Sequence, residues 1–410
     1  MATRYDLFSA EFKADPFPTF AEMRHNAPIY AHKDRGGRTI WYFTRYRDVM
    51  TVMRDARFVK DPMNAQERSK KQVRSKQAPS LQQAINRNML FSDPPDHTRL
   101  RALVNLAFTP RRVERMADQV QAAADRLLDA VIDTGKIELI GDYALPLAII
   151  IISDLLGIPE ADRDQVALWS QSIISPGGRG LKASERKRQM RAFVDYLNDL
   201  FAERQRSPQD DLITALVEAE AEGEKLTEME LSSMVALLLV TGHETTVNLI
   251  GNGALTLLTH PDQLALLLAN PHLIDSAVEE LLRYDGPVET STTRWVGEDL
   301  TYAGHVMKRG DVVRVVITSA NRDSAEFPTP NTLDITRKRN KHLQFGHGIH
   351  YCLGAPLARL EGRIGLWTLF TRLSNLRLTT PADQLKWRPG VLFRGLDTLP
   401  LQFDRMNDSL

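Results

Sequence analysis

The feature that most constrains this chain is an apolar segment of about 30 residues that begins at Thr227, far longer than the usual α-helix. Glu230 follows Thr227 at the spacing of a capping box, in which each side chain bonds the backbone N–H of the other residue. Apolar residues then cover nearly every helical face as far as Leu258. A helix that is apolar all round is normally buried. The sequence therefore predicts one long central helix.

The rest of the chain predicts a mainly α fold with small β-sheets. Helical periodicity marks residues 113–132 and 192–204, whereas residues 39–44 and 311–318 alternate like strands. We find no internal repeat and no linker that would divide the chain. We therefore expect a single domain over residues 1–410.

Composition excludes several classes of protein. The 52 basic side chains balance the 52 acidic ones, which argues against a nucleic-acid binder. The first 13 residues lack the apolar core of a signal peptide. The densest apolar run, residues 144–152, is interrupted by Pro146 and falls far short of the roughly 20 residues of a spanning helix. We expect a cytoplasmic protein without a membrane span.

The chain contains one cysteine, Cys352, which excludes an internal disulfide and favours a reducing compartment. Gly346 and Gly348 precede it and Gly354 follows, so the backbone can turn tightly and approach a flat ligand. A helical pattern starts at Ala355. Cys352 would lie just ahead of that helix, where the N–H groups and the dipole stabilise a thiolate.

Two other roles for this cysteine are open on these residues alone. Cysteines are often buried structural residues. A zinc site formed by His347, His350 and Cys352 would be cramped and lacks an obvious fourth ligand.

The segment resembles the haem-binding signature of the cytochrome P450 family, on the pattern Phe345-x-x-Gly348-x-His350-x-Cys352-x-Gly354. This resemblance implies the P450 fold and haem b (iron protoporphyrin IX), with Cys352 as the iron ligand. It implies that Phe345 packs beside the sulfur, that Gly354 lets backbone donors approach it, and that His350 bonds a haem propionate.

A second motif of the family is present in Glu280-Leu-Leu-Arg283. Three residues apart on a helix, the two charges share a face and can pair, although such pairs are common on solvated surfaces. The family adds an arginine from the segment before the cysteine. Thr332 stands where that arginine is expected, and Arg337 is the alternative.

On the long helix, Gly242, Glu244 and Thr245 resemble the oxygen-binding side of the family. The resemblance implies that Gly242 gives oxygen room, while Glu244 and Thr245 hold the water that delivers protons. Thr241 replaces a frequent alanine. The alternative is that Thr245 bonds its own helix and Glu244 has a buried partner.

The resemblance also assigns cations to the haem propionates. His97 and Arg101 match the helix that would reach one propionate, and Arg294 matches the position that would reach the other. Buried carboxylates require such partners.

The same resemblance implies a mostly apolar substrate pocket, which suits a medium or large lipophilic molecule such as a terpenoid, steroid or polyketide. Its expected lining is Ile85, Arg87, Leu90, Ala236, Leu237, Val240, Thr241, Val288, Glu289, Thr290, Val391 and Leu392, with Arg87, Glu289 and Thr290 as possible anchors. Basic residues in segments 68–76 and 182–188 border the implied entrance. They leave open an anionic substrate, either a fatty acid or a carrier-bound acyl chain.

With no nucleotide-binding domain visible, the resemblance implies a monomer that receives electrons from a ferredoxin or flavodoxin. The candidate contacts are Arg111, Arg112, Arg359 and Arg363. A peroxide-driven hydroxylase and a haem-thiolate redox or gas sensor are the competing functions.

Overall fold

The computed structural model describes residues 5–34, 36–66, 87–174, 182–221 and 223–405. The chain forms two compact units: a larger one of residues 1–66, 120–146 and 245–410, and a smaller one of residues 67–119 and 147–244. Three helices contain a boundary between the units, and they are α8 (Ala117–Asp129), α9 (Leu145–Leu156) and α13 (Glu228–Leu258).

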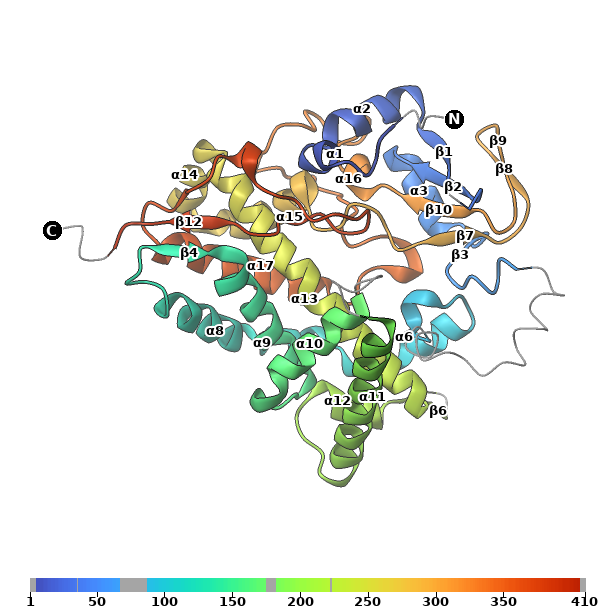
Figure 1. The fold of residues 1–410 in the computed structure, drawn as a ribbon, viewed down its shortest axis with the longest axis horizontal. Coiled ribbons are helices and arrows are strands. Elements are labelled where there is room, and N and C mark those ends of the chain that lie inside the picture. The colour runs from blue at the N-terminus through green and yellow to red at the C-terminus, as the bar shows by residue number, and fades with distance from the viewer. Residues whose placement is uncertain (1–4, 35, 67–86, 175–181, 222, 406–410) are drawn as a thin grey trace. The chain divides into compact units, whose positions relative to one another are not determined.

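The larger unit combines helices with short strands (Figure 1). Its helices are α1 (Ala10–Ala14), α2 (Phe17–Asn26), α3 (Tyr46–Arg54), the π-helix Leu139–Ala144, α14 (Pro261–Ala269), α15 (Ile274–Asp285), α16 (Ile317–Ala320), α17 (Ala355–Arg372) and the one-turn helices Pro271–Leu273, Gly348–His350 and Ala382–Gln384. Its strands are β1 (Ile29–Lys33), β2 (Thr39–Phe43), β3 (Phe58–Val59), β4 (Lys136–Glu138), β7 (Arg294–Val296), β8 (Leu300–Tyr302), β9 (His305–Met307), β10 (Val312–Val315), β11 (Arg377–Leu378) and β12 (Pro400–Gln402).

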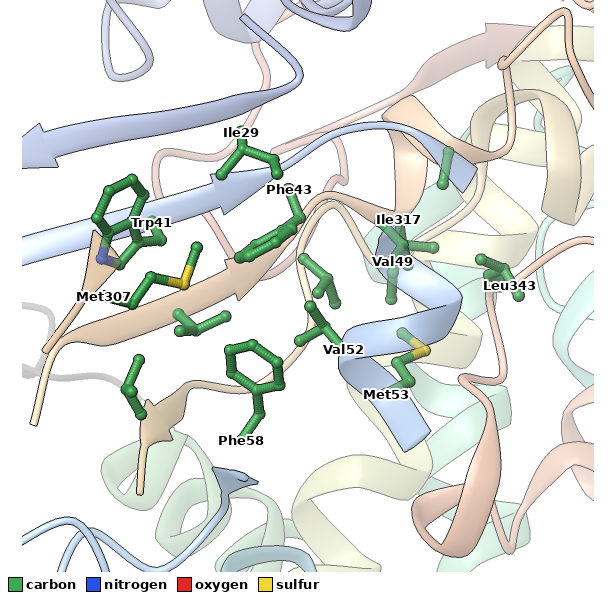
Figure 2. Packing of buried hydrophobic residues seen from close by; sticks show 14 of the residues in the cluster. Ile29, Trp41, Phe43, Val49, Val52, Met53, Phe58, Met307, Ile317 and Leu343 are labelled. Atoms are coloured by element: carbon green, nitrogen blue, oxygen red, sulfur yellow. The ribbon is translucent and has the colours of Figure 1, made fainter. Parts of the chain in front are cut away.

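The main sheet of this unit has the strand order β1-β2-β10-β7-β3. Within it β2 and β10 run parallel, with Trp41 opposite Val313, and the other neighbours are antiparallel. Figure 2 shows Phe43 and Phe58 of the sheet packed beside Val52 and Met53 of α3. The strand predictions at 39–44 and 311–318 are confirmed, although α16 begins at Ile317.

The smaller unit consists mainly of helices. They are the one-turn helix Met89–Phe91, α6 (Asp96–Ala107), α7 (Pro110–Glu114), the one-turn helix Glu160–Asp162, α10 (Arg163–Ile174), α11 (Ala183–Arg206) and α12 (Leu212–Glu218). Its short strands are β5 (Glu220–Ala221) and β6 (Glu224–Lys225). The sequence predicted one continuous helix over residues 113–132. This prediction is wrong, because α7 ends at Glu114 and α8 begins at Ala117.

The predicted long helix is confirmed as the 31-residue α13, an unbroken helix in Figure 1. Its capping box forms as expected: Thr227 N donates to Glu230 Oε2 at 2.9 Å, and Glu230 N donates to Thr227 Oγ1 at 3.3 Å. Among the described residues, α13 and segment Leu139–Leu156 are long and apolar enough to cross a membrane. Their apolar windows are 72% and 67% buried within the protein, as in core helices of soluble proteins.

Candidate functional site

The loop that carries Cys352 is closed by backbone hydrogen bonds. Cys352 N donates to Phe345 O at 2.8 Å, and Gly346 N donates to Leu343 O at 2.8 Å. Gly346 and Gly348 have φ angles of 71° and 76°, which disfavour residues with a side chain. A Cβ on Gly348 would also lie 3.0 Å from Met53 O. The two glycines therefore set the shape of the loop.

The loop is attached to the main sheet and α3. Leu343 is buried in the hydrophobic cluster of Figure 2, together with Met53. Arg54 Nε donates to His347 Nε2 at 2.6 Å. Burial and the neighbouring Arg54 lower the pKa of His347, which keeps this nitrogen an acceptor. The zinc alternative loses its support, since no cluster of three potential metal ligands occurs among the described residues.

Cys352 itself is exposed, although thiols are usually buried. Gly354 is the N-cap of α17, and Pro356 lies in the first turn. A Cβ on Gly354 would lie 4.0 Å from Cys352 Sγ, an ordinary van der Waals contact, so glycine keeps the space beside the sulfur open. The sulfur therefore lies close to the positive end of an 18-residue helix.

A half-buried charge cluster lies beside Phe345. The Arg359 guanidinium is 4.4 Å from the centre of the Phe345 ring and bonds Glu279 at 2.6 and 2.9 Å. His342 Nε2 lies 3.1 Å from the same carboxylate. Burial alone would raise the pKa of Glu279, but the hydrogen bonds from His342 and Arg359 lower it to about 2.

The arginines that were expected to meet an electron donor have acidic neighbours. Arg359 is paired with Glu279, Arg363 lies 3.6 Å from Asp275, and in the smaller unit Arg112 lies 3.6 Å from Asp210. Arg111 is exposed.

The Glu280 network is complete. Arg283, on the same helix, binds both Glu280 oxygens at 2.8 Å. Arg337 Nε donates to Glu280 Oε2 at 3.0 Å, and Asn340 Nδ2 donates to the same oxygen at 3.0 Å. Thr332 contributes its backbone carbonyl, which accepts from Arg283 at 3.2 Å and from Arg337 at 3.3 Å. Arg337 is therefore the second arginine of this network.

On α13, Glu244 and Thr245 are half-buried and adjacent. In the smaller unit, a Cβ on Gly242 would lie 2.7 Å from Ile152 Cδ1, so glycine allows this close packing. Thr241 Oγ1 donates to Leu237 O at 2.7 Å, a bond within the helix.

The partner of Thr246 was not among the residues predicted from the sequence. Its Oγ1 donates at 3.0 Å to Glu361 Oε2, on a carboxyl that is 1% exposed. Burial raises the pKa of Glu361 to about 8. One signal was available, because Glu361 falls one helical turn after Leu357, on the apolar face of α17.

The candidate propionate ligands are arginine and histidine side chains at buried or half-buried positions. In the larger unit Arg294 is 5% exposed, and its Nη1 donates to Phe58 O at 3.3 Å. In the smaller unit His97 is 3% exposed and Arg101 follows four residues later on α6. Burial, then the charge of Arg101, lowers the pKa of His97. His350 is half-buried at the end of the one-turn helix in the cysteine loop.

The expected pocket residues divide by burial. Ala236 and Leu237 are buried, Arg87 is exposed, and half-buried positions are Leu90, Val240, Thr241, Val288, Val391 and Leu392. Ile85 and the basic segment 68–76 lie outside the described residues. In the second basic segment Lys182, Lys187 and Arg188 are exposed, and Arg188 pairs with Glu185.

Glu289 requires a correction. It was expected to anchor a substrate, but it is 1% exposed and both its oxygens accept from Lys13 Nζ at 2.7 Å. Burial raises the pKa of Glu289 and lowers that of Lys13. The hydroxyl of Thr290 donates to Val391 O at 2.6 Å. The Glu289 carboxylate and the Thr290 hydroxyl therefore stabilise the fold at this position.

Comparison with known proteins matches this geometry to one family. The Cytochrome P450 family pattern matches residues 179–394. The chain is 42% identical to the polyketide biosynthesis cytochrome P450 PksS of Bacillus subtilis, over 96% of this chain and 97% of that protein. It is 42% identical to the cytochrome P450 monooxygenase PikC of Streptomyces venezuelae, over 96% and 92%.

Solved structures agree with these relatives. The solved structure of PksS aligns with a TM-score of 0.90 and 40% identity, and the alignment covers 98% of this chain and 100% of the PksS chain. P450BioI was solved with an acyl carrier protein that bears hexadec-9Z-enoic acid. It aligns with a TM-score of 0.85 and 37% identity over 96% of this chain and 99% of the P450BioI chain. The chain belongs to the cytochrome P450 family of haem-thiolate monooxygenases.

Proposed function

We propose that Cys352 is the thiolate ligand of haem b in this protein, and that the chain acts as one P450 domain over residues 1–410. The observation that carries the proposal is an exposed thiol, the only one in the chain, on a glycine-shaped loop at the start of α17. A softer anionic ligand than thiolate is not available among protein side chains. Haem, when bound, supplies the oxygen chemistry of the family.

The other residues fit the same group by their chemistry. Arg294, His97 and Arg101 are cations or hydrogen-bond donors on buried or half-buried positions, as two propionates require. Phe345 offers a buried aromatic ring in the loop that contains the sulfur.

We assign proton delivery to Glu244 and Thr245. They are neighbours on α13, so a carboxylate and a hydroxyl are available at one point of a largely apolar helix. The hydroxyl can hold a water and pass on a proton that the carboxylate takes from solvent. Thr245→Ala should retain haem but divert reducing equivalents from product to peroxide. An unchanged yield of product per reducing equivalent consumed would exclude this role.

The substrate is, on this proposal, a medium or large lipophilic molecule, preferably a polyketide-like one, which is hydroxylated or epoxidised. The name of PksS supports this class, as do the apolar residues Leu90, Leu237 and Val240. Two electrons would come from a ferredoxin or flavodoxin to a monomeric, cytoplasmic enzyme.

A carrier-bound acyl chain is the second candidate. The acyl-carrier complex of P450BioI and the exposed cations Lys182 and Lys187 favour it. Binding of an acidic carrier to this segment should weaken with salt, because exposed charges are screened within about 8 Å at physiological ionic strength. Salt-insensitive binding would count against it.

The decisive measurement is the visible spectrum of the reduced protein with carbon monoxide. We expect the red-shifted band of a thiolate ligand, lost in Cys352→Ser and retained in Ile349→Val, a conservative change at an exposed position of the same loop. A red-shifted band in Cys352→Ser, with the fold intact by circular dichroism, would exclude this ligand. Spin-shift titrations with macrolactones, fatty acids and acyl carriers then separate the substrate classes, and substrate-dependent nicotinamide oxidation separates an enzyme from a sensor.

A further inference from the structure

A narrow polar stripe runs along the C-terminal half of α13. Thr245, Asn248, Asn252 and Thr256 recur at intervals of three or four residues, which places them on one helical face, and Thr259 directly follows the last residue of the helix. Most other residues of this half are buried and apolar. Such a stripe is unfavourable in a core helix unless its polar groups find partners.

Asn248 is the most unusual member of the stripe. It is 1% exposed, and neither its Oδ1 nor its Nδ2 has a hydrogen-bond partner in the described part of the chain. A Cβ on Gly395 would lie 2.0 Å from Asn248 Oδ1, so only glycine at position 395 accommodates this amide. Buried amides of this kind are usually satisfied by ordered water.

Asn252, one turn further on, connects the stripe to other elements. Its Nδ2 donates to Asp285 O at 3.2 Å and to Arg394 O at 3.0 Å, whereas its Oδ1 has no partner among the residues described. Neighbours four residues apart on a helix lie about 5–6 Å from one another, a distance that one water can bridge. Asn248 and Asn252 can therefore share a water.

The stripe ends in a cavity of about 560 Å³. Thr256, Thr259 and His260 line its α13 side, and Asp285 lines it at the end of α15. The Asp15 side chain also lines it and is exposed, so the cavity has a carboxylate in contact with solvent. Carboxylates raise the local concentration of cations, including protons.

We propose that this face of α13 is a hydrated path that carries water and protons from the cavity to Thr245. Asn248 and Asn252 are positioning residues that hold its waters. Thr256 and Thr245 are 11 residues apart on the helix, or about 16 Å, which a few bridging waters span. Each proton enters from solvent, and every water on the path accepts one O–H proton and releases another, so no further reactant is needed.

The inference rests on the proposed role of Thr245, and a crystal structure separates the two. We expect ordered water on the amide of Asn248 and between Asn248 and Asn252. If a high-resolution crystal structure shows no ordered water on the Asn248 amide, the path is overturned, whether or not Thr245 delivers protons.

Turnover tests the function of the path. Asn248→Leu keeps the size of the side chain but cannot hold water, and it should slow product formation by on the order of tenfold, less than the effect of a direct acid or base. It should also raise the solvent deuterium isotope effect. Asn248→Ser leaves room for a water and should restore most of the rate, which a purely structural role would not predict.

Thr256→Val is a second, milder variant that guards against misfolding, and Thr371→Val on the exposed side of α17 is its matched control. We expect Thr256→Val to raise the isotope effect and Thr371→Val to leave it unchanged. Suppose that Asn248→Leu and Thr256→Val both show the wild-type isotope effect, while Thr245→Ala diverts reducing equivalents to peroxide. This result would refute the path and leave the proposed function standing. If Thr245→Ala still uses its reducing equivalents for product as the wild type does, the role of Thr245 is refuted instead.

Discussion

Glu361 allows a quantitative test of how burial sets charge in this protein. Its carboxyl is 1% exposed and accepts one hydrogen bond from Thr246, and its Oε1 has no partner within the described residues. Burial raises its pKa from 4.5 to about 8, and the hydrogen bond from Thr246 opposes this only in part. The folded protein therefore holds this proton at neutral pH, where the unfolded chain has released it.

The sign of the effect follows from proton binding. Between pH 4.5 and about 8 the folded state binds one more proton than the unfolded state, so the free energy of unfolding falls as the pH rises. Each pH unit is worth about 1.4 kcal/mol. Glutamine never ionises and keeps an oxygen acceptor for Thr246. The stability of Glu361→Gln relative to wild type should therefore increase by about 3 kcal/mol between pH 5 and pH 7.

Urea unfolding of both proteins at several pH values, followed by circular dichroism at matched haem occupancy, measures this difference. Glu114→Gln, a change of an exposed glutamate, is the control and should show no such trend. A stability difference between Glu361→Gln and wild type that stays constant from pH 5 to pH 7 would show that the buried carboxyl does not titrate in this range.

Three further changes test the buried ion pairs and the helix cap. Arg337→Leu should lower the free energy of unfolding by about 2 kcal/mol, since Glu280 loses one of its charged partners; an unchanged urea midpoint would contradict this. Lys13→Met should cost about 3–5 kcal/mol by leaving Glu289 without its cation, and adding Glu289→Gln should recover part of the loss. Thr227→Ala should cost about 1 kcal/mol in thermal unfolding through loss of the cap on α13, and no change would show that this end of the helix is frayed.

Local features of the fold could be predicted because their causes lie within a few residues. The capping box at Thr227, the glycine turns before Cys352 and the Glu280–Arg283 pair depend on spacings of three to six residues. Periodicity also predicted α13 and α17, since apolar helical faces must be buried. The break between Glu114 and Ala117 was missed because the apolar stripe continues across it.

Pairs that are distant along the chain could not be predicted. Lys13 and Glu289 are separated by 276 positions, and Thr246 and Glu361 by 115. Spacing therefore cannot reveal them. Glu289 was assigned to the substrate pocket by the family resemblance, because nothing in the sequence shows that its partner is Lys13. Arg337 was the harder case, because it is 57 positions from Glu280 and Thr332 occupied the expected place.

Close packing links the helix that follows Cys352 to the helix that carries Thr245. A Cβ on Gly362 of α17 would lie 2.8 Å from Leu249 Cδ2 of α13, and a Cβ on Gly253 of α13 would lie 3.2 Å from Leu366 Cδ1 of α17. The bond from Thr246 to Glu361 crosses the same contact. Glycines allow two helices to approach closely, and a buried hydrogen bond fixes their register. Since Thr245 and Thr246 point about 100° apart around the helix, anchoring Thr246 to α17 also fixes the direction in which Thr245 presents its hydroxyl.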